Sequence, residues 1–594
     1  MVVTAELPLI CSAAALALVA LSLFVASRSA PARSVAILFA MAATVAPLLL
    51  AALIEPAHAA GRALWEWSAA GGPTVQASYR FDGIAAIGVA VGAAYTGAGL
   101  FGAARATERH PLLPSAVLAM GLVFFALAVT EDLIAGTVVL GVLASITILA
   151  TLAVAPLPAT TRLAAYLAVG IQFFVLAALL VSRFGGASFR FDAIGPGAIS
   201  PGSILAASIG AALFAGLYPF IPWRFRAQPR GPRLERLRGV VTMPAGVGAT
   251  LLLLRLLGTT RGDLTTIALP DLPIGLRVTT AVFALAVATG IALRGRRVPR
   301  RAVAIAGIVV VLLAAYPALH WAHLILLAAL LSVLYAAAVS LALPEQWDVV
   351  RYDVTLAAFW IAIAVGTPTA IAGGLFILVA DAATALAESV WDRPHGRHVL
   401  VIAGSAATVT GLLVILAGSL VARDQGAQGL AIAGLLAIAA LVLVHVGRRI
   451  DIGPDQDVPI VLDGLSAAIA AGAAALTGLL VAVPVYQGVT VALGRQFAPA
   501  VATPFGFLAA VALSTLLVVI ARSLRPFVPD LAPFAERLRG IIAIADPVPV
   551  GQAAFTALDA IVSRTTATFN LFERRAGVWL ATVLIIAVLV WSVR

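Results

Sequence analysis

Two carboxyl groups lie in an otherwise apolar stretch of the chain, where each could carry a proton. Asp381 and Glu388 occur in TAIAGGLFILVADAATALAESVW, and their spacing of seven residues places both on one face of a helix. An ionisable side chain at membrane depth is costly and is by default a candidate for function. The pattern indicates a proton relay through these two residues. The alternative is that Asp381 pairs with a nearby arginine or lies near the membrane surface.

Other ionisable side chains stand at the ends of apolar segments. His320 and His323 enclose Trp321, so they could load protons at the mouth of a path, or anchor a helix at the membrane interface. Glu131 and Asp132 separate two apolar segments with almost no loop. That position is typical of a solvated turn, and a place on the proton path is the alternative.

The remaining residues exclude several kinds of chemistry. The one cysteine, Cys11, cannot form an iron–sulfur cluster site or an intrachain disulfide. We find no His/Cys metal spacing, phosphate loop or nucleophile elbow, so we expect no catalytic residue, metal or cofactor on this chain. All 38 basic side chains of the Lys and Arg class are arginines, which stay charged in practice. One of them, Arg255, ends an apolar segment, where a snorkelling side chain is the simplest interpretation.

The elements that must position these groups are membrane-spanning helices. The chain has 594 residues, of which 62% are hydrophobic and 11% charged, too apolar for a water-soluble protein. We predict an all-α polytopic membrane protein with about 16 or 17 transmembrane helices. The apolar segments lie near 7–27, 35–54, 83–103, 112–130, 133–155, 163–182, 203–221, 240–258, 277–294, 302–318, 321–343, 354–387, 398–420, 429–446, 462–484, 498–520 and 577–592.

Two of these segments contain helix breakers at mid-membrane positions. One holds Gly216 and Pro219, and the other holds Gly366 and Pro368. Broken helices are tolerated where protein or a water-filled cavity surrounds them, and a pair of them in two halves of a chain favours inverted repeats around a transport path. Ordinary proline kinks are the alternative.

Arginine is distributed unevenly over the first ten connections between segments. The odd-numbered connections carry 16 arginines and the even-numbered ones carry six. The positive-inside rule then places the odd connections in the cytoplasm and the N-terminus outside, as expected for a multi-pass protein of a bacterial cytoplasmic (inner) membrane. The net charge of +11 follows from these connections, so we expect the lipid bilayer, and no nucleic acid, as a partner.

Several short motifs follow one another between about residues 79 and 380. They are YRFDGIAAIGVAVGAAYTGAGLF (79–101), PFIPW (219–223), TMPAGVGATLLLLR (242–255), RRAVAIAGIVVVLL (300–313) and VGTPTAIAGGLF (365–376). In this order they resemble the antiporter-like subunit family, which comprises the proton-channel subunits of respiratory complex I, the Mrp-type Na⁺/H⁺ antiporters and the membrane arms of hydrogenase-4-like complexes.

The resemblance implies a line of buried charged groups across the membrane, which this sequence keeps only in part. Position by position, the family's charged residues become Gly141–Leu143 (no carboxylate), Phe214 for a lysine, Ile221 for a histidine, Arg238 for a second histidine and Leu331 for a second lysine. His323 corresponds to a further histidine of the family. The resemblance therefore implies the scaffold with a weakened or rerouted proton relay.

The resemblance also implies a domain organisation. We expect N-terminal helices in 1–110, half-channels in 111–260 and 261–420, further helices in 421–520, an amphipathic lateral helix in 521–576 and a final span in 577–594.

The function expected from this resemblance is that of a membrane-arm subunit in a complex I-related, redox-linked assembly, which docks other membrane subunits and peripheral redox subunits. Such an assembly would be an oxidoreductase of the NADH:quinone-oxidoreductase-like or hydrogenase-like kind, with its catalytic centre on another chain. The alternatives are an ion-translocating subunit of a non-redox transporter, such as an Mrp-type antiporter or an inorganic-carbon uptake complex, or a non-conducting structural subunit.

Overall fold

The computed structural model describes most of the chain between residues 62 and 448, and a shorter part near the C-terminus. The described residues are 62–68, 74–80, 82–106, 113–183, 188–194, 196–218, 220, 232–260, 264–293, 299–342, 347–390, 394–448, 504–523, 533–534, 536–538 and 540. The predicted spans at 7–27, 35–54, 462–484 and 577–592 lie outside them, as does most of the predicted amphipathic region.

The described part of the chain is almost entirely helical, as predicted. It contains seven helices that are long and apolar enough to cross a membrane, together with shorter apolar helices of 10–17 residues. The chain is therefore an all-α polytopic membrane protein.

The chain forms two compact units, of which the larger contains residues 1–271 and 317–539. Its described elements are β1 (Arg62–Ser68), β2 (Thr74–Tyr79), α3 (Gly83–Ala106), α4 (Leu113–Val129), α5 (Leu133–Val154), α6 (Leu157–Arg183), η2 (Pro196–Ala198), α7 (Pro201–Ala215), α9 (Pro232–Gly258), η3 (Leu264–Thr266), α12 (Trp321–Ala342), α13 (Trp347–Val365), α14 (Pro368–Val390), α15 (Pro394–Ser419), α16 (Gln425–Arg448) and α18 (Pro504–Ser523). The smaller unit contains α10 (Ile274–Leu293) and α11 (Pro299–Ala315), which pack against each other.

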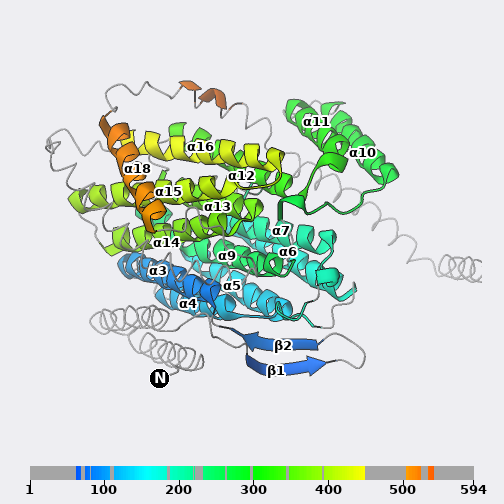
Figure 1. Cartoon of the computed structure of the whole chain (residues 1–594), viewed down its shortest axis with the longest axis horizontal. Coiled ribbons are helices and arrows are strands. Elements are labelled where there is room, and N and C mark those ends of the chain that lie inside the picture. The colour runs from blue at the N-terminus through cyan, green and yellow to red at the C-terminus, as the bar shows by residue number, and fades with distance from the viewer. Residues whose placement is uncertain are drawn as a thin grey trace, which may run out of the picture. The chain divides into compact units, whose positions relative to one another are not determined.

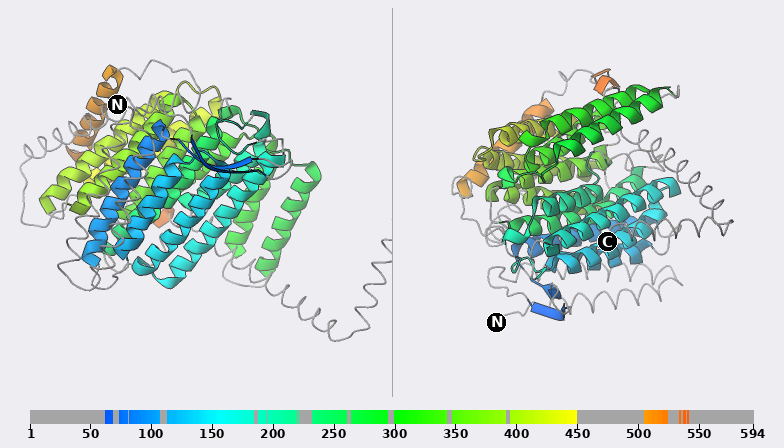
Figure 2. Two further views of the ribbon diagram at one scale, coloured as in Figure 1. Left: turned by 90° about the horizontal axis from the view of Figure 1, so that it is seen from below. Right: turned by 90° about the vertical axis from the view of Figure 1, so that its right-hand side faces the viewer.

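The helices of the larger unit run roughly parallel to one another in two groups, α3 to α9 and α12 to α16 (Figures 1 and 2). The groups meet along a seam where α3 packs on α14 and α9 packs on α13. Burial follows this arrangement, because the apolar window of α9 is 100% buried and that of α3 is 83% buried, whereas that of α6 is only 33% buried. The seam is thus shielded from lipid, whereas α6 faces the lipid.

One predicted break is in fact a turn between two helices. The apolar run 354–387 divides into α13 and α14, which are joined at Gly366 and Thr367 and pack side by side. A Cβ added to Gly374 would lie 2.7 Å from the Cβ of Ala362, as expected for antiparallel helices. The prediction that Gly366 and Pro368 interrupt one helix in mid-membrane is therefore wrong. A turn of two residues leaves no polar gap by which hydropathy could separate the two helices.

The first predicted break is a helix end in the structure. Helix α7 stops at Ala215, and Gly216 caps it in the left-handed conformation with φ of 64°. Its 15 residues span only about 22 Å, less than the hydrocarbon core. Pro219 lies outside the described residues, so whether a second half-helix follows stays a prediction.

Candidate functional site

An arginine and two carboxylates meet inside the α13–α14 hairpin. Arg351 of α13 donates from Nη1 to Glu388 Oε1 at 2.7 Å, and its Nε lies 3.7 Å from Asp381 Oδ1. The side chains of Arg351, Asp381 and Glu388 are 11%, 6% and 7% exposed. The spacing of seven residues thus places both acids on the face of α14 that is directed toward Arg351.

Two tyrosines complete this group at the seam. The Tyr95 hydroxyl of α3 donates to Asp381 Oδ2 at 2.7 Å, and Arg351 Nη2 donates to the Tyr352 hydroxyl at 3.2 Å. The two tyrosine rings pack edge to face with their centroids 6.4 Å apart. We call Tyr95, Arg351, Tyr352, Asp381 and Glu388 the Arg351 cluster. It links helices from both groups.

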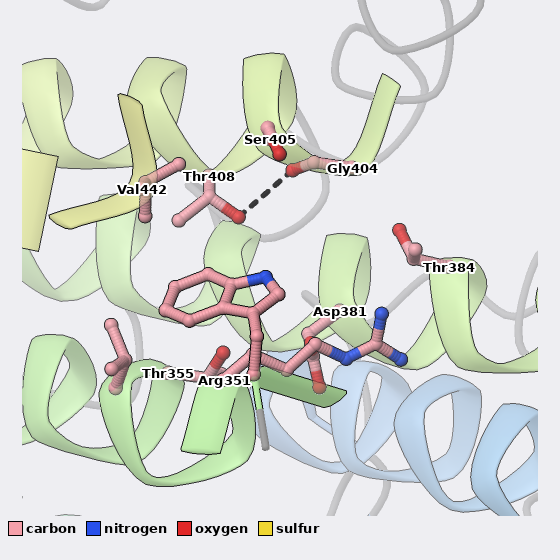
Figure 3. A pocket seen from close by; sticks show the side chains of 10 residues that line it. Arg351, Thr355, Asp381, Thr384, Gly404, Ser405, Thr408 and Val442 are labelled. Carbon is pink, nitrogen blue, oxygen red and sulfur yellow. Dashed lines mark hydrogen bonds and ion pairs between the residues drawn. The ribbon is translucent and has the colours of Figure 1, made fainter. Parts of the chain in front are cut away.

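A cavity lies beside the Arg351 cluster, between α13, α14, α15 and α16. It leaves ≈ 40 Å³ for the centres of water molecules, which is room for about three of them. Figure 3 shows Arg351 and Asp381 on one side of it, with Ser405 and Thr408 of α15 across from them. Its polar side chains could hydrogen-bond such waters. The lining residues are Trp347, Arg351, Val354, Thr355, Asp381, Thr384, Gly404, Ser405, Thr408 and Val442.

The charges of the Arg351 cluster do not balance when both acids are ionised. Asp381 and Glu388 then carry two negative charges against the single positive charge of Arg351. One proton on either acid would make the group neutral, because both acids face the same arginine. This arrangement can accept and release one proton while Arg351 stays charged.

Both acids stand out in the sequence, whereas Arg351 and Tyr95 do not. Arg351 stands in WDVVRYDV, a polar stretch just ahead of the apolar run, so it looked like part of a connection. A signal was nevertheless present, because Arg351 precedes Gly366 by 15 residues and Asp381 follows it by 15. Once the turn is known, a helical hairpin must bring those two positions together.

Arg255 does not snorkel, contrary to the prediction. Its guanidinium donates to both carboxylate oxygens of Asp82 at 2.9 Å and to the Ala128 carbonyl at 2.8 Å, and its side chain is 6% exposed. Little water reaches the Arg255 guanidinium in this buried position, and the bidentate pair with Asp82 stabilises its charge instead. The pair connects the end of α9 to the start of α3, and neither residue belongs to the Arg351 cluster.

Arg238 is also buried, near the beginning of α9. The next residue, Gly239, packs against the ring of Tyr352. Arg238 therefore lies on the part of α9 that borders the Arg351 cluster, and its part in a proton path stays a prediction.

Glu131 and Asp132 do not form a solvated turn, because they are only 1% and 0% exposed. Glu131 pairs with Arg80 at 3.2 Å and with Arg190 at 3.7 Å. Asp132 caps α5 by accepting from the backbone N–H groups of Ile134 and Ala135. Burial raises the pKa of Glu131 above its ordinary value of 4.5, against the influence of both arginines.

These two acids are covered by a feature that no sequence pattern indicated. Strand β2 pairs with β1 in an antiparallel hairpin, and Tyr79 bridges to Thr130. Gln76 of β2 also donates its N–H to Asp132 Oδ2 at 3.2 Å. The short hairpin between apolar segments thus excludes water from the connection.

His320 and His323 lie at the beginning of α12, and the structure brings them to Asp424 at the beginning of α16. The two imidazole rings stack with centroids 5.5 Å apart. His320 Nδ1 and His323 Nε2 lie 3.2 Å and 3.6 Å from Asp424 Oδ2. They are at the end of α12 remote from the Arg351 cluster, so the structure does not bring them together with Asp381.

The positions where the resemblance implies a relay in the first half are filled by packing residues. Phe214 is 1% exposed and packs edge to face on Phe174. Leu143 is fully buried, and Ile221 lies outside the described residues. The described part of the first half therefore has an aromatic side chain where the family has a lysine.

Comparisons with known proteins agree with this fold. No protein-family model matches the sequence, and a search of curated proteins finds no match. Among solved structures, a chain of the Mrp complex from Dietzia sp. DQ12-45-1b matches 98% of this chain with a TM-score of 0.62 at 16% identity, and this chain covers 62% of it.

Two respiratory complexes contain similar chains. A chain of respiratory complex I from Thermus thermophilus with bound NADH has a TM-score of 0.50 at 15% identity, over 85% of this chain and 99% of that one. A chain of the archaeal membrane-bound sulfane sulfur reductase has a TM-score of 0.52 at 12% identity, over 86% and 99%. The protein therefore has the fold of the antiporter-like membrane subunits, as its motifs predicted.

Proposed function

We propose that this chain is a membrane subunit of a multisubunit ion-translocating assembly and that it moves protons through the Arg351 cluster. The observation that carries the proposal is the pair of carboxylates, Asp381 and Glu388, that share one arginine beside a polar cavity at the seam of an antiporter-like fold. Buried ionisable groups of this kind are costly and mark ion paths in membrane proteins.

The positions of the groups along α14 give the orientation of the path relative to the membrane. Asp381 lies 13 residues after Pro368, about 20 Å along the helix, and Glu388 lies about 30 Å along it. Tyr95 contacts Asp381 near the middle of the bundle, and Arg351 joins Asp381 to Glu388 toward one end. By the positive-inside rule this end faces the cytoplasm. We propose that protons pass between the cavity, Asp381 and Glu388 in the second half-channel.

Arg351 would be the permanent positive charge of this path. Because a guanidinium keeps its charge, it would not carry the proton itself. It would instead stabilise whichever acid is ionised, so that the proton moves between Asp381 and Glu388.

A conduction measurement tests this path. The chain and the subunits that copurify with it would be reconstituted into liposomes containing a pH-sensitive dye, and a potassium diffusion potential would drive proton uptake. Asp381→Asn should lower the uptake rate at least tenfold, whereas Asp381→Glu, which keeps a titratable group, should retain most of it. Equal rates for Asp381→Asn and the unmodified chain, at equal amounts of folded protein, would overturn the proposal.

The nature of the assembly is a separate question. The likeness to chains of respiratory complex I and of the sulfane sulfur reductase supports the redox-linked reading, while the Mrp match over 98% of this chain supports the non-redox alternative. Purification in mild detergent followed by mass spectrometry distinguishes them. Copurifying hydrophilic subunits with cluster-binding cysteines would support the redox-linked assembly, and membrane subunits alone would favour the transporter.

A further inference from the structure

Three potential metal ligands converge where α12 and α16 begin. His320 precedes α12, His323 lies in its first turn, and Asp424 directly precedes α16. One ligand atom from each residue lies within 4.8 Å of the other two. His320 and Asp424 are 104 residues apart, which is why no linear metal motif appears in the sequence.

We propose that His320, His323 and Asp424 bind a divalent transition-metal cation of the zinc class. Two imidazoles and one carboxylate are a ligand set that Zn²⁺ commonly uses, with water in the fourth position. This site is independent of the proton path.

The distances suit such an ion. Metal–ligand bonds of about 2.0–2.1 Å in tetrahedral geometry place neighbouring ligand atoms about 3.3 Å apart. The two imidazole nitrogens lie 3.2 Å and 3.6 Å from Asp424 Oδ2, so an ion can be accommodated with displacements of a few tenths of an ångström at these contacts. The His320 side chain is 42% exposed, which gives the ion a route from water.

Asp424 is already prepared as a ligand. Its Oδ1 accepts the backbone N–H groups of Gly426 and Ala427 at 2.8 Å and 3.1 Å, which holds the carboxylate and directs Oδ2 to the imidazoles. Hydrogen bonds of this kind orient metal ligands in proteins.

His323 must exchange one hydrogen bond when the ion binds. Its Nδ1 now accepts the backbone N–H of His320 at 3.1 Å. A metal ion on Nε2 leaves the ring proton on Nδ1, which then cannot accept a hydrogen bond. The backbone N–H of His320 would donate to water instead. The His320 side chain is 42% exposed, so water reaches this residue.

A bound ion would join α12 to α16 where these two helices begin. These helices pack against each other, and the ion would add a cross-link at the end opposite Arg351. The expected consequence is greater thermal stability of the protein when the ion is present.

Metal titration of the purified protein tests the inference. After treatment with a chelator, the chain should bind one equivalent of Zn²⁺, and Co²⁺ at the same site should give the visible absorption of tetrahedral coordination. His320→Gln and Asp424→Asn should each weaken binding at least tenfold. Asn remains a good helix cap, so the Asp424→Asn protein should fold.

The control is a second histidine pair with the same spacing in the sequence, His395 and His398. The double variant His395→Gln/His398→Gln should bind Zn²⁺ as the unmodified chain does. The inference is overturned if the unmodified chain binds no Zn²⁺, if His320→Gln and Asp424→Asn bind it equally well, or if binding is lost only in the control variant.

Discussion

Arg351 contacts both acids of the Arg351 cluster and one of its tyrosines. It neutralises part of the charge of Asp381 and Glu388, and it donates to the Tyr352 hydroxyl. With 38 arginines and no lysine, the chain has only permanent positive charges from its long basic side chains. Any proton that moves through the Arg351 cluster must therefore reside on a carboxylate, a tyrosine or water.

Glu131 offers a residue-scale prediction about pH. Because burial raises its pKa above 4.5, the folded chain binds this proton more tightly than the unfolded chain does. This contribution to stability is full below pH 4.5 and is lost as the pH rises through the higher pKa of the folded state. The melting temperature of the unmodified chain, minus that of Glu131→Gln, should thus fall between pH 4 and pH 8.

The control for this prediction is Asp271→Asn, at an exposed acid on the connection between α9 and α10. A difference between unmodified chain and Glu131→Gln that stays constant, or grows, across this range would contradict the assigned direction.

A candidate site residue could be identified from the sequence where its polarity contrasts with an apolar run. Asp381 and Glu388 stood out because an acid in an apolar run has few explanations. Arg351 and Tyr95 did not, because their importance arises from contacts with residues 30 and 286 positions away. Glu131 and Asp132 were misread as solvated because the strands that cover them lie 50 or more residues earlier.

Helices α13 and α14 form the element that positions the site. The turn between them depends on Gly366, which has φ of 69° and whose Cβ, if present, would lie 2.7 Å from the Cβ of Leu264. L-residues other than Gly rarely adopt this conformation.

Gly366→Ala should therefore destabilise the chain. The left-handed backbone alone costs about 1–2 kcal/mol, and the contact with Leu264 adds to it. Gly429→Ala is the matched control, since a Cβ on Gly429 in α16 meets nothing within 4 Å and alanine favours a helix by up to about 1 kcal/mol. Melting in detergent should show the two variants shifting in opposite directions. Equal melting temperatures for both would contradict the role assigned to Gly366.

Helices were easier to predict than their connections. Continuous apolar runs of spanning length correspond to α3, α4, α5, α6 and α12 because lipid requires such runs. The prediction of one interrupted helix in 354–387 was wrong because a two-residue turn leaves no polar gap in the hydropathy of the sequence. The β1–β2 hairpin was not predicted. Its exposed tryptophans, Trp65 and Trp67, are also typical of the end of a membrane helix and so did not indicate a strand.

At the scale of the larger unit, apolar side chains occupy the outside as well as the inside. Helices α5 and α6 expose large hydrophobic residues that would be unfavourable in water. They are Val138, Val142, Leu149, Leu152, Leu157, Val169, Val175, Leu176 and Leu179. This face is expected to contact lipid or another apolar subunit.

Cysteine labelling tests that expectation. In a Cys11→Ser background the chain has no other thiol. Val142 in the middle of α5 is 47% exposed and Trp65 on β1 is 57% exposed, so geometry alone makes them similar. A water-soluble maleimide should label Trp65→Cys at least tenfold faster than Val142→Cys in membranes, and both equally after denaturation. Equal rates in membranes would mean that water reaches this face of α5.

The hairpin that carries Arg351 also bears on how the chain enters the membrane during synthesis. Inserted alone, α14 would bring Asp381 into the bilayer near its centre, at about 2.5–3.5 kcal/mol, and α13 would bring Arg351 near its first turns. Arg351 and Asp381 stand equally far from the turn, so the two helices can leave the translocon together with their charges already opposed. Helix α3, which is synthesised earlier, then supplies the Tyr95 hydroxyl to Asp381. In this order of events neither Arg351 nor Asp381 enters the lipid as an unpaired charge.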